Sequence, residues 1–137
     1  MKIFLSYKQT GVSETELKKE LSNIKEIIEN TWNKTYVYLF DKERENNFKF
    51  IIKRVKEKII KSDLVLWFIN HSKKSEWQLI ELWIAEWLNK KILFIINERF
   101  RDDYFLIYWL KSDVLYYKKI EEVDQLLTNY IESKKNK

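Results

Sequence analysis

Glu81 is the side chain whose setting most needs a chemical explanation. It falls within residues 75–89, a stretch whose apolar side chains recur at the spacing of an α-helix. The broad apolar arc of this predicted helix consists of Ile80, Trp83, Ile84, Trp87 and Leu88. We expect Glu81 at the edge of that arc, and a buried carboxylate without a partner costs several kcal/mol. The residue is therefore either a functional group at the rim of a pocket or a half-exposed glutamate that pairs with a lysine.

The chain holds few other groups that could do chemistry. Its 137 residues include no Cys, one Gly (Gly11) and one His (His71). The lack of Cys excludes thiol nucleophiles, disulfide scaffolds and the common zinc modules. One His cannot form an HExxH metal site, and one Gly cannot form a glycine-rich phosphate loop. Carboxylates, hydroxyls, lysines, arginines and aromatic rings remain, and we expect a site with no metal and no cofactor.

The composition predicts one folded domain over residues 1–137. Apolar residues make up 45% of the chain, and 26 Lys and Arg against 21 Asp and Glu give a net charge of +5. Lysines are interleaved with glutamates, which is typical of solvated helix faces, so we expect no nucleic-acid partner. We find no stretch that could span a membrane and no signal pattern, which favours a cytoplasmic protein without membrane contact. The clearest basic cluster lies in a tail from about residue 133 that we expect to fray.

Hydrophobic patterning predicts strands that alternate with helices. Strands are expected at residues 2–7, 35–40, 64–69, 91–96 and 114–117. Helices are expected at residues 13–32, 48–60, 75–89 and 120–131, with a short aromatic helix at 102–110. Ser13 with Glu16, and Ser75 with Gln78, have the spacing of a capping box at two of the helix starts.

This alternation predicts an α/β fold of the flavodoxin-like kind. Right-handed crossovers would place the five strands parallel in the order 2-1-3-4-5, with helices on both faces in a three-layer sandwich. The continuous apolar run at 64–69 is typical of a central strand buried on both faces. Ligands of such sheets bind beyond the carboxyl ends of the strands, which here are residues 6–10, 40–42, 70–72 and 97–99.

Several segments carry a family resemblance. The runs KIFLSYKQTG, LFDKERENNF, SDLVLWFIN and SEWQLIELWIAEWLNKKILFII resemble the nucleoside 2-deoxyribosyltransferase-like superfamily, which includes transferases and nucleoside 5'-phosphate N-glycoside hydrolases. The pattern of Glu81 and Leu82 on a helix, followed by Lys90 and Lys91 before an apolar strand, matches its signature. The resemblance implies cleavage of an N-glycosidic bond. Glu81 would act as nucleophile at the anomeric carbon or as electrostatic stabiliser of the sugar.

The same helix is also similar to that of a TIR domain. Ser75, Trp77, Glu81 and Leu82 follow the S-x-W-x-x-x-E-L spacing around that family's NAD-cleaving glutamate. This second resemblance implies an NAD hydrolase or cyclase, and a nucleotide-binding sensor without activity is a further alternative. The expected partner is a small molecule in each case: a nucleoside, a nucleotide or NAD.

The resemblance also implies which residues line the pocket for sugar and base. We expect substrate-binding residues after the first strand and at the neighbouring strand and helix ends: Ser6, Tyr7, Lys8, Thr10, Gly11, Asp41, Asn70, Ser75 and Trp77. Asp41 could hold a ribose hydroxyl or cap a turn. Ser75 could help to bind a phosphate at a positive helix end, or it could be a plain N-cap.

The predicted helix 75–89 is apolar on more than one side. Leu79 and Leu82 fall away from the main apolar arc, so the domain alone would not cover the whole helix. We therefore expect a homodimer formed through this helix. In the alternative, residues 102–110 fold back over the helix and the protein is a monomer.

Overall fold

The computed structural model describes residues 1–8, 11–30, 33–71, 75–109 and 112–136, with the backbone alone over 104–109. The strands are β1 (Lys2–Ser6), β2 (Lys34–Tyr36), β3 (Leu64–Ile69), β4 (Lys91–Asn97) and β5 (Asp113–Tyr117). The α-helices are α1 (Glu14–Glu29), α2 (Phe48–Ile60), α3 (Glu76–Trp87) and α4 (Glu122–Lys135). Two 3-10 helices are η1 (Tyr38–Phe40) and η2 (Glu98–Trp109).

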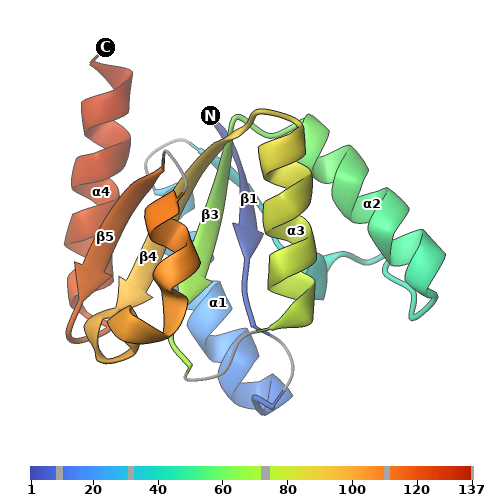
Figure 1. The fold of residues 1–137 in the computed structure, drawn as a ribbon, viewed down its shortest axis with the longest axis horizontal. Helices are drawn as coiled ribbons and strands as arrows, with labels where there is room; N and C mark the ends of the chain where they lie inside the picture. The colour runs from blue at the N-terminus through green and yellow to red at the C-terminus, as the bar shows by residue number, and fades with distance from the viewer. Residues whose placement is uncertain (9–10, 31–32, 72–74, 110–111, 137) are drawn as a thin grey trace.

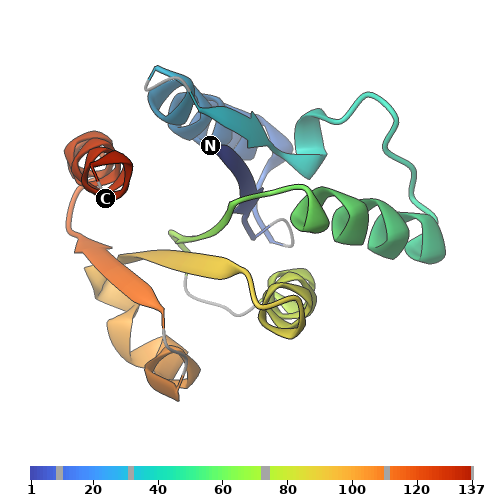
Figure 2. The same cartoon turned by 90° about the horizontal axis from the view of Figure 1, so that it is seen from above.

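The five strands form one parallel sheet in the order β2-β1-β3-β4-β5 (Figure 1), which confirms the predicted topology. Every residue of β3 is buried because this strand has a neighbour on each edge and helices over each face. The sheet separates two apolar cores (Figure 2). One core packs under α1 and α4, and the other packs under α2 and α3.

The second strand is shorter than the prediction of 35–40. β2 ends at Tyr36, and residues 38–40 turn into η1, where the Phe40 N–H bonds the Val37 carbonyl at 3.0 Å. This turn buries Leu39, which is 4% exposed, at the edge of the sheet. Asp41 consequently follows a 3-10 turn and does not end a strand.

The orientation of α3 corrects the predicted apolar arc. Its buried residues are Gln78, Glu81, Leu82 and Ala85. Trp83 and Trp87 lie outside the core, at 64% and 89% exposure. The Trp67 indole N–H bonds the Gln78 carbonyl at 3.1 Å, and the Gln78 side chain donates to the Phe68 carbonyl at 3.0 Å. These two bonds to β3 fix the rotation of the helix, and the small Ala85 lets it approach the sheet.

The final elements also differ in extent from the prediction. The predicted helix at 102–110 is the longer 3-10 helix η2, which begins at Glu98 and packs against β4 and β5. Helix α4 continues through Lys135, beyond the start of the predicted tail, and Lys134 forms an ion pair with Asp113 at 3.3 Å. Among the described residues, no helix combines the length and apolar character that crossing a membrane requires.

Candidate active site

The end of β1 and the buried face of α3 bring Ser6 and Glu81 together. Ser6 is fully buried as the last residue of β1, and Glu81 is 8% exposed one turn and a half into α3. The Ser6 side chain lies close enough to lower the pKa of the Glu81 carboxyl group. Ser6 Oγ and Glu81 Oε2 are nevertheless both buried without a hydrogen-bond partner among the described residues. Two adjacent polar atoms are thus left available to a bound molecule.

Burial dominates the ionisation of Glu81. It raises the pKa of this carboxyl group to about 8, against the smaller opposing effect of Ser6. The alternative that Glu81 is a half-exposed glutamate paired with a lysine is therefore wrong. Glu81 is 8% exposed, and none of the described ion pairs includes it. A pKa this high in a recessed position is characteristic of residues that exchange protons or react.

Tyr7 connects Glu81 with the surroundings of a large cavity. Its ring is buried, and burial together with the nearby charge of Glu81 raises the pKa of its hydroxyl group. A hydrogen bond with the Leu39 backbone and the charge of Arg44 act in the opposite direction. Tyr7 therefore lies between Glu81 on α3 and the η1 region, and it stays protonated at neutral pH.

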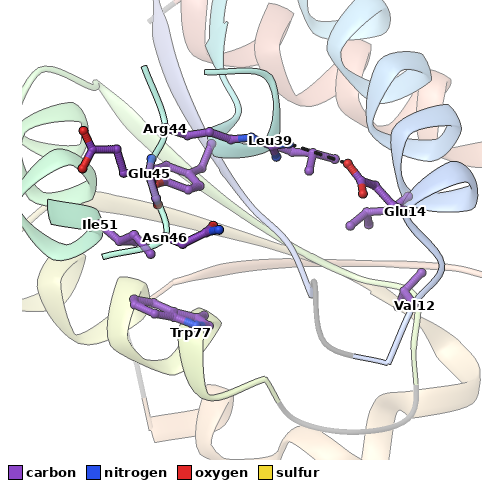
Figure 3. Close-up of a pocket in the computed structure, with 10 residues that line it drawn as sticks. Val12, Glu14, Leu39, Arg44, Glu45, Asn46, Ile51 and Trp77 are labelled. Carbon is purple, nitrogen blue, oxygen red and sulfur yellow. Dashed lines mark hydrogen bonds and ion pairs between the residues drawn. The ribbon is translucent and has the colours of Figure 1, made fainter. Parts of the chain in front are cut away.

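The cavity has a volume of about 770 Å³, within the range of small-molecule sites (Figure 3). Its wall is built from the start of α1, η1 and the loop after it, α2 and the first turn of α3. The residues are Val12, Glu14, Leu17, Tyr38, Leu39, Arg44, Glu45, Asn46, Ile51 and Trp77. Glu81 is not part of this wall, but Tyr7 has three wall residues as electrostatic or hydrogen-bond neighbours. Tyr7 thus has both the buried carboxyl group and the cavity wall as neighbours.

Aromatic rings and one arginine give the cavity its character. Trp77 projects from α3 and packs against Phe48 with the ring centroids 5.3 Å apart. Tyr38 faces the same space from η1. Arg44 reaches across from the loop after η1 to Glu14 at 3.7 Å, an ion pair between exposed side chains (Figure 3). Flat rings and a guanidinium group suit an aromatic base with polar substituents.

Asp41 anchors the loop that carries Arg44. Its carboxylate accepts hydrogen bonds from the Tyr36 hydroxyl at 2.6 Å, Arg54 Nε at 2.8 Å and the Glu43 N–H at 2.9 Å. Burial would raise the pKa of Asp41, but Arg54, Tyr36 and the Glu43 N–H together lower it to about 2. The structure therefore shows the Asp41 carboxylate held by hydrogen bonds beneath the loop. A contact of Asp41 with ribose stays a prediction.

Asn70 lies on the other side of the sheet from α3. Its amide donates to Glu20 on α1 at 3.2 Å, and its carbonyl oxygen accepts from the Tyr117 hydroxyl at 2.7 Å and from Asn97 at 3.0 Å. This network is separate from Glu81. The described residues contain no group of three or more His, Cys, Asp or Glu side chains arranged to hold a metal ion.

The remaining predicted binding residues are placed as follows. Ser75 is the N-cap of α3, and its hydroxyl accepts the Gln78 N–H at 3.4 Å. The reciprocal half of the predicted capping box is not formed, because the Gln78 side chain bonds β3 instead. Gly11 adopts φ +80 just before the cavity residue Val12, in a conformation that favours glycine. Lys8 is half-buried after β1, and Thr10 lies outside the described residues.

Most of the cavity wall was not predicted from the sequence. Trp77 was expected there, but no role was expected for the other polar and aromatic wall residues Glu14, Tyr38, Arg44, Glu45 and Asn46. The signal for the last three was the polar loop at 41–47, in which Arg44 is the only arginine. No local pattern indicated that this loop folds toward α1 and α3.

The fold and the site together define a flavodoxin-like α/β domain with a buried carboxyl group at the carboxyl edge of the sheet. The CMP N-glycosidase BcmB from Clostridium botulinum has the same fold, with a TM-score of 0.72 and 23% identity over 95% of this chain and 99% of that one. A 2-deoxyribosyltransferase from Bacillus psychrosaccharolyticus gives a TM-score of 0.57 and 17% identity over 90% of each chain. A conserved protein from Enterococcus faecalis V583 gives 0.53 and 12% over 91% and 86%.

These likenesses confirm the fold that the resemblance to deoxyribosyltransferase-like proteins implied. The resemblance to TIR domains stays a prediction. No protein-family model and no curated protein sequence matches the chain.

Proposed function

We propose that this protein cleaves or transfers the N-glycosidic bond of a nucleoside or a nucleoside 5'-monophosphate, with Glu81 as the catalytic residue. The observation that carries the proposal is the buried Glu81 carboxyl group, which has an oxygen without a partner among the described residues. Ser6 lies beside it, and Tyr7 connects it with a cavity that has aromatic walls. The fold shared with proteins named as a CMP N-glycosidase and a 2-deoxyribosyltransferase supports the same chemistry.

In the proposed reaction, the bond between the sugar C1' and the base nitrogen breaks and its electron pair leaves with the base. Positive charge then develops on the sugar. The ionised form of Glu81, a minor fraction at neutral pH that grows as the pH rises toward 8, either forms a bond to C1' or stabilises this charge. In hydrolysis, water supplies a hydroxyl group to C1' and a proton to the base, whereas in transfer a second base takes the place of water.

In this proposal, different residues contact different parts of the substrate. The rings of Trp77 and Tyr38 flank the base, and Arg44 bonds its polar edge or the sugar substituents. Ser6 and the protonated Tyr7 hydroxyl lie close to Glu81, where the sugar C1' must come. Lys8, Thr10 and Gly11 remain proposed contacts from the segment after β1.

A base-release assay tests the proposed function. The protein is incubated separately with ribonucleosides, deoxyribonucleosides, their 5'-monophosphates and NAD, and the products are separated by chromatography. Release of a free base from a nucleoside or monophosphate, lost in Glu81→Gln, is the expected result. Release of nicotinamide alone would instead favour the TIR-like NAD hydrolase, and binding without any release would favour the sensor. Either of these results would overturn the proposal.

We also propose that two copies of the chain pair through α3. Trp83 and Trp87 are 64% and 89% exposed on one helix, and η2, which packs against β4 and β5, leaves both uncovered. A second copy related by a two-fold axis would bury both rings against their equivalents. Leu82 points into its own core at 6% exposure, so the contact is expected through the tryptophans.

Light scattering after size exclusion tests this pairing. The wild-type protein should have the mass of a dimer at micromolar concentration, and Trp87→Lys should shift it to the monomer. Ile60→Lys is the matched control because it also replaces an exposed apolar residue, 48% exposed, but lies on α2. A monomeric wild-type protein would contradict the proposal.

A further inference from the structure

A groove lined by four lysines lies at the amino ends of β1 and β2. It has a volume of about 330 Å³, and its wall includes Lys2, Lys34, Lys58 and Lys61. Because β1 runs from Lys2 to Ser6, this groove is at the opposite end of the strand from Ser6 and Glu81, near the label N in Figure 1. It is therefore distinct from the candidate active site.

The fold itself brings these lysines together. The parallel register of β1 and β2 pairs Lys2 with Lys34. The last turn of α2 adds Lys58 and its C-cap residue Lys61. The Lys58 ammonium group lies 5.1 Å from the centroid of the Tyr36 ring, which holds it over the groove wall. Three elements distant in sequence thus converge on one concave, positively charged surface.

Two acidic groups border the groove, although no acidic side chain belongs to its described wall. Asp63 accepts the backbone N–H of Lys2 at 2.7 Å. Glu29 pairs with Lys25 at 2.6 Å and accepts the Thr35 N–H at 3.4 Å. Within the described part of the chain, none of the ion pairs includes one of the four groove lysines.

The end of α2 does not need these lysines for capping. The Ser62 hydroxyl donates to the Lys58 carbonyl at 2.7 Å. Lys90 Nζ donates to the carbonyl oxygens of Ile60 and Ser62 at 2.8 Å and 3.0 Å. The free carbonyls at the negative end of the helix already have donors, so Lys58 and Lys61 can direct their charge toward a ligand.

The described groove wall presents positive charge, and its one aromatic ring, Tyr36, is already in contact with Phe4 and Lys58. The Tyr36 ring stacks on Phe4 at 5.5 Å on one side and carries the Lys58 ammonium group 5.1 Å from its centroid. The wall contains lysines, whose rotatable ammonium groups attract phosphate as point charges, and no arginine. We propose that this groove binds a short chain of phosphate groups, either as an inorganic oligophosphate or as the phosphate tail of a nucleotide.

Calorimetric titration with inorganic tripolyphosphate tests the site, independently of the proposed reaction at Glu81. We expect saturable binding to the wild-type protein that weakens between about 50 and about 200 mM salt. The double variant Lys34→Gln with Lys61→Gln should weaken binding at least about tenfold. The matched control is Lys19→Gln with Lys53→Gln, which removes the same charge from exposed positions outside the groove. Circular dichroism and thermal unfolding establish that both variants are folded.

The outcomes distinguish specific binding in the groove from general attraction of an anion to a positively charged surface. No saturable binding of tripolyphosphate, or equal weakening in the two double variants, would overturn the proposal. A nucleoside triphosphate that binds as tightly as tripolyphosphate supports recognition of the phosphate chain alone. If a single-stranded RNA oligomer bound much more tightly than tripolyphosphate, and the groove variant weakened that binding, the proposed ligand would be wrong. The groove would then bind a nucleic-acid backbone. Base release by both double variants should match that of the wild type.

Discussion

Helices α1 and α3 cover opposite faces of the same sheet and distribute their side chains in opposite ways. Helix α1 buries only apolar residues, which are Leu17, Leu21, Ile24 and Ile28. Helix α3 buries Gln78 and Glu81 together with Leu82 and Ala85, while two of its tryptophans face outward. Helix α1 therefore contributes only apolar side chains to its core, whereas α3 places two polar side chains in the interior beside the candidate site.

The two buried polar residues of α3 are themselves unlike each other. Gln78 is hydrogen-bonded to β3 through both its backbone carbonyl and its side chain, so its burial is structurally compensated. Glu81 has an oxygen without a partner among the described residues and a pKa raised to about 8. A buried group left uncompensated in a stable fold is the expected signature of a functional residue.

The largest effect is expected from Glu81→Gln. This substitution removes the ionisable carboxyl group and keeps the shape, so turnover should fall by at least about a thousandfold while the fold is preserved. Base release under saturating substrate is the measurement. Glu86→Gln is the control, because it makes the same change on the exposed side of α3. Full activity of the Glu81 variant would remove the proposed mechanism.

The counterpart on α1 is Leu21→Ala, which should affect stability and leave chemistry alone. Leu21 is fully buried, so its truncation should cost about 2 to 5 kcal/mol of unfolding free energy. Urea unfolding measures this loss, and turnover per folded molecule should equal that of the wild type. A change in turnover comparable to that of the Glu81 variant would contradict the division of roles between the helices.

The pH dependence of stability should separate α3 from α1 further. Burial raises the pKa of Glu81 from its ordinary value of 4.5 to about 8 in the folded protein, so the folded state holds the proton more tightly than the unfolded chain does. The resulting stabilisation is complete below pH 4.5 and is lost as the pH rises through 8. Wild-type stability should therefore fall relative to Glu81→Gln across this range, by a few kcal/mol at most. A constant difference between the two proteins would contradict the raised pKa.

The smallest effect is expected from alanine substitution of two N-cap residues, Ser13 on α1 and Ser75 on α3. Ser13 accepts the Glu16 N–H at 3.2 Å at the start of α1, and Ser75 accepts the Gln78 N–H at 3.4 Å at the start of α3. Alanine at either position should cost about 1 kcal/mol of stability. If Ser75 also contacts substrate, Ser75→Ala should raise KM while Ser13→Ala does not. Equal KM values would leave Ser75 as a cap alone.

The order of the strands could be predicted because it depends on patterns that are local. The run of six apolar residues in β3 is typical of a central strand, and the apolar spacing at residues 13–32 predicted the helix α1. Glu81 stood out because a carboxylate is unusual in so apolar a helix. Composition and periodicity thus predicted the fold and one residue of the candidate site.

The rotation of α3 and the wall of the cavity could not be predicted in this way. Periodicity assumes that the buried side of a helix is its most apolar side, and this assumption fails where Gln78 bonds β3. The position of Arg44 depends on a contact between Asp41 and Arg54, which are 13 residues apart. Such long-range polar contacts leave no regular spacing in the sequence.

The hydrogen bonds to the Asp41 carboxylate have a consequence for which residues around the cavity can be substituted. Tyr36 and Arg54 fix the loop at its base, while residues 42–46 are all exposed and include three side chains of the cavity wall. Substitutions of the side chains at residues 42–46 would therefore change the cavity wall without touching the sheet or the hydrogen bonds to the Asp41 carboxylate. The wall of the cavity and the carboxyl group on α3 can thus vary independently of each other.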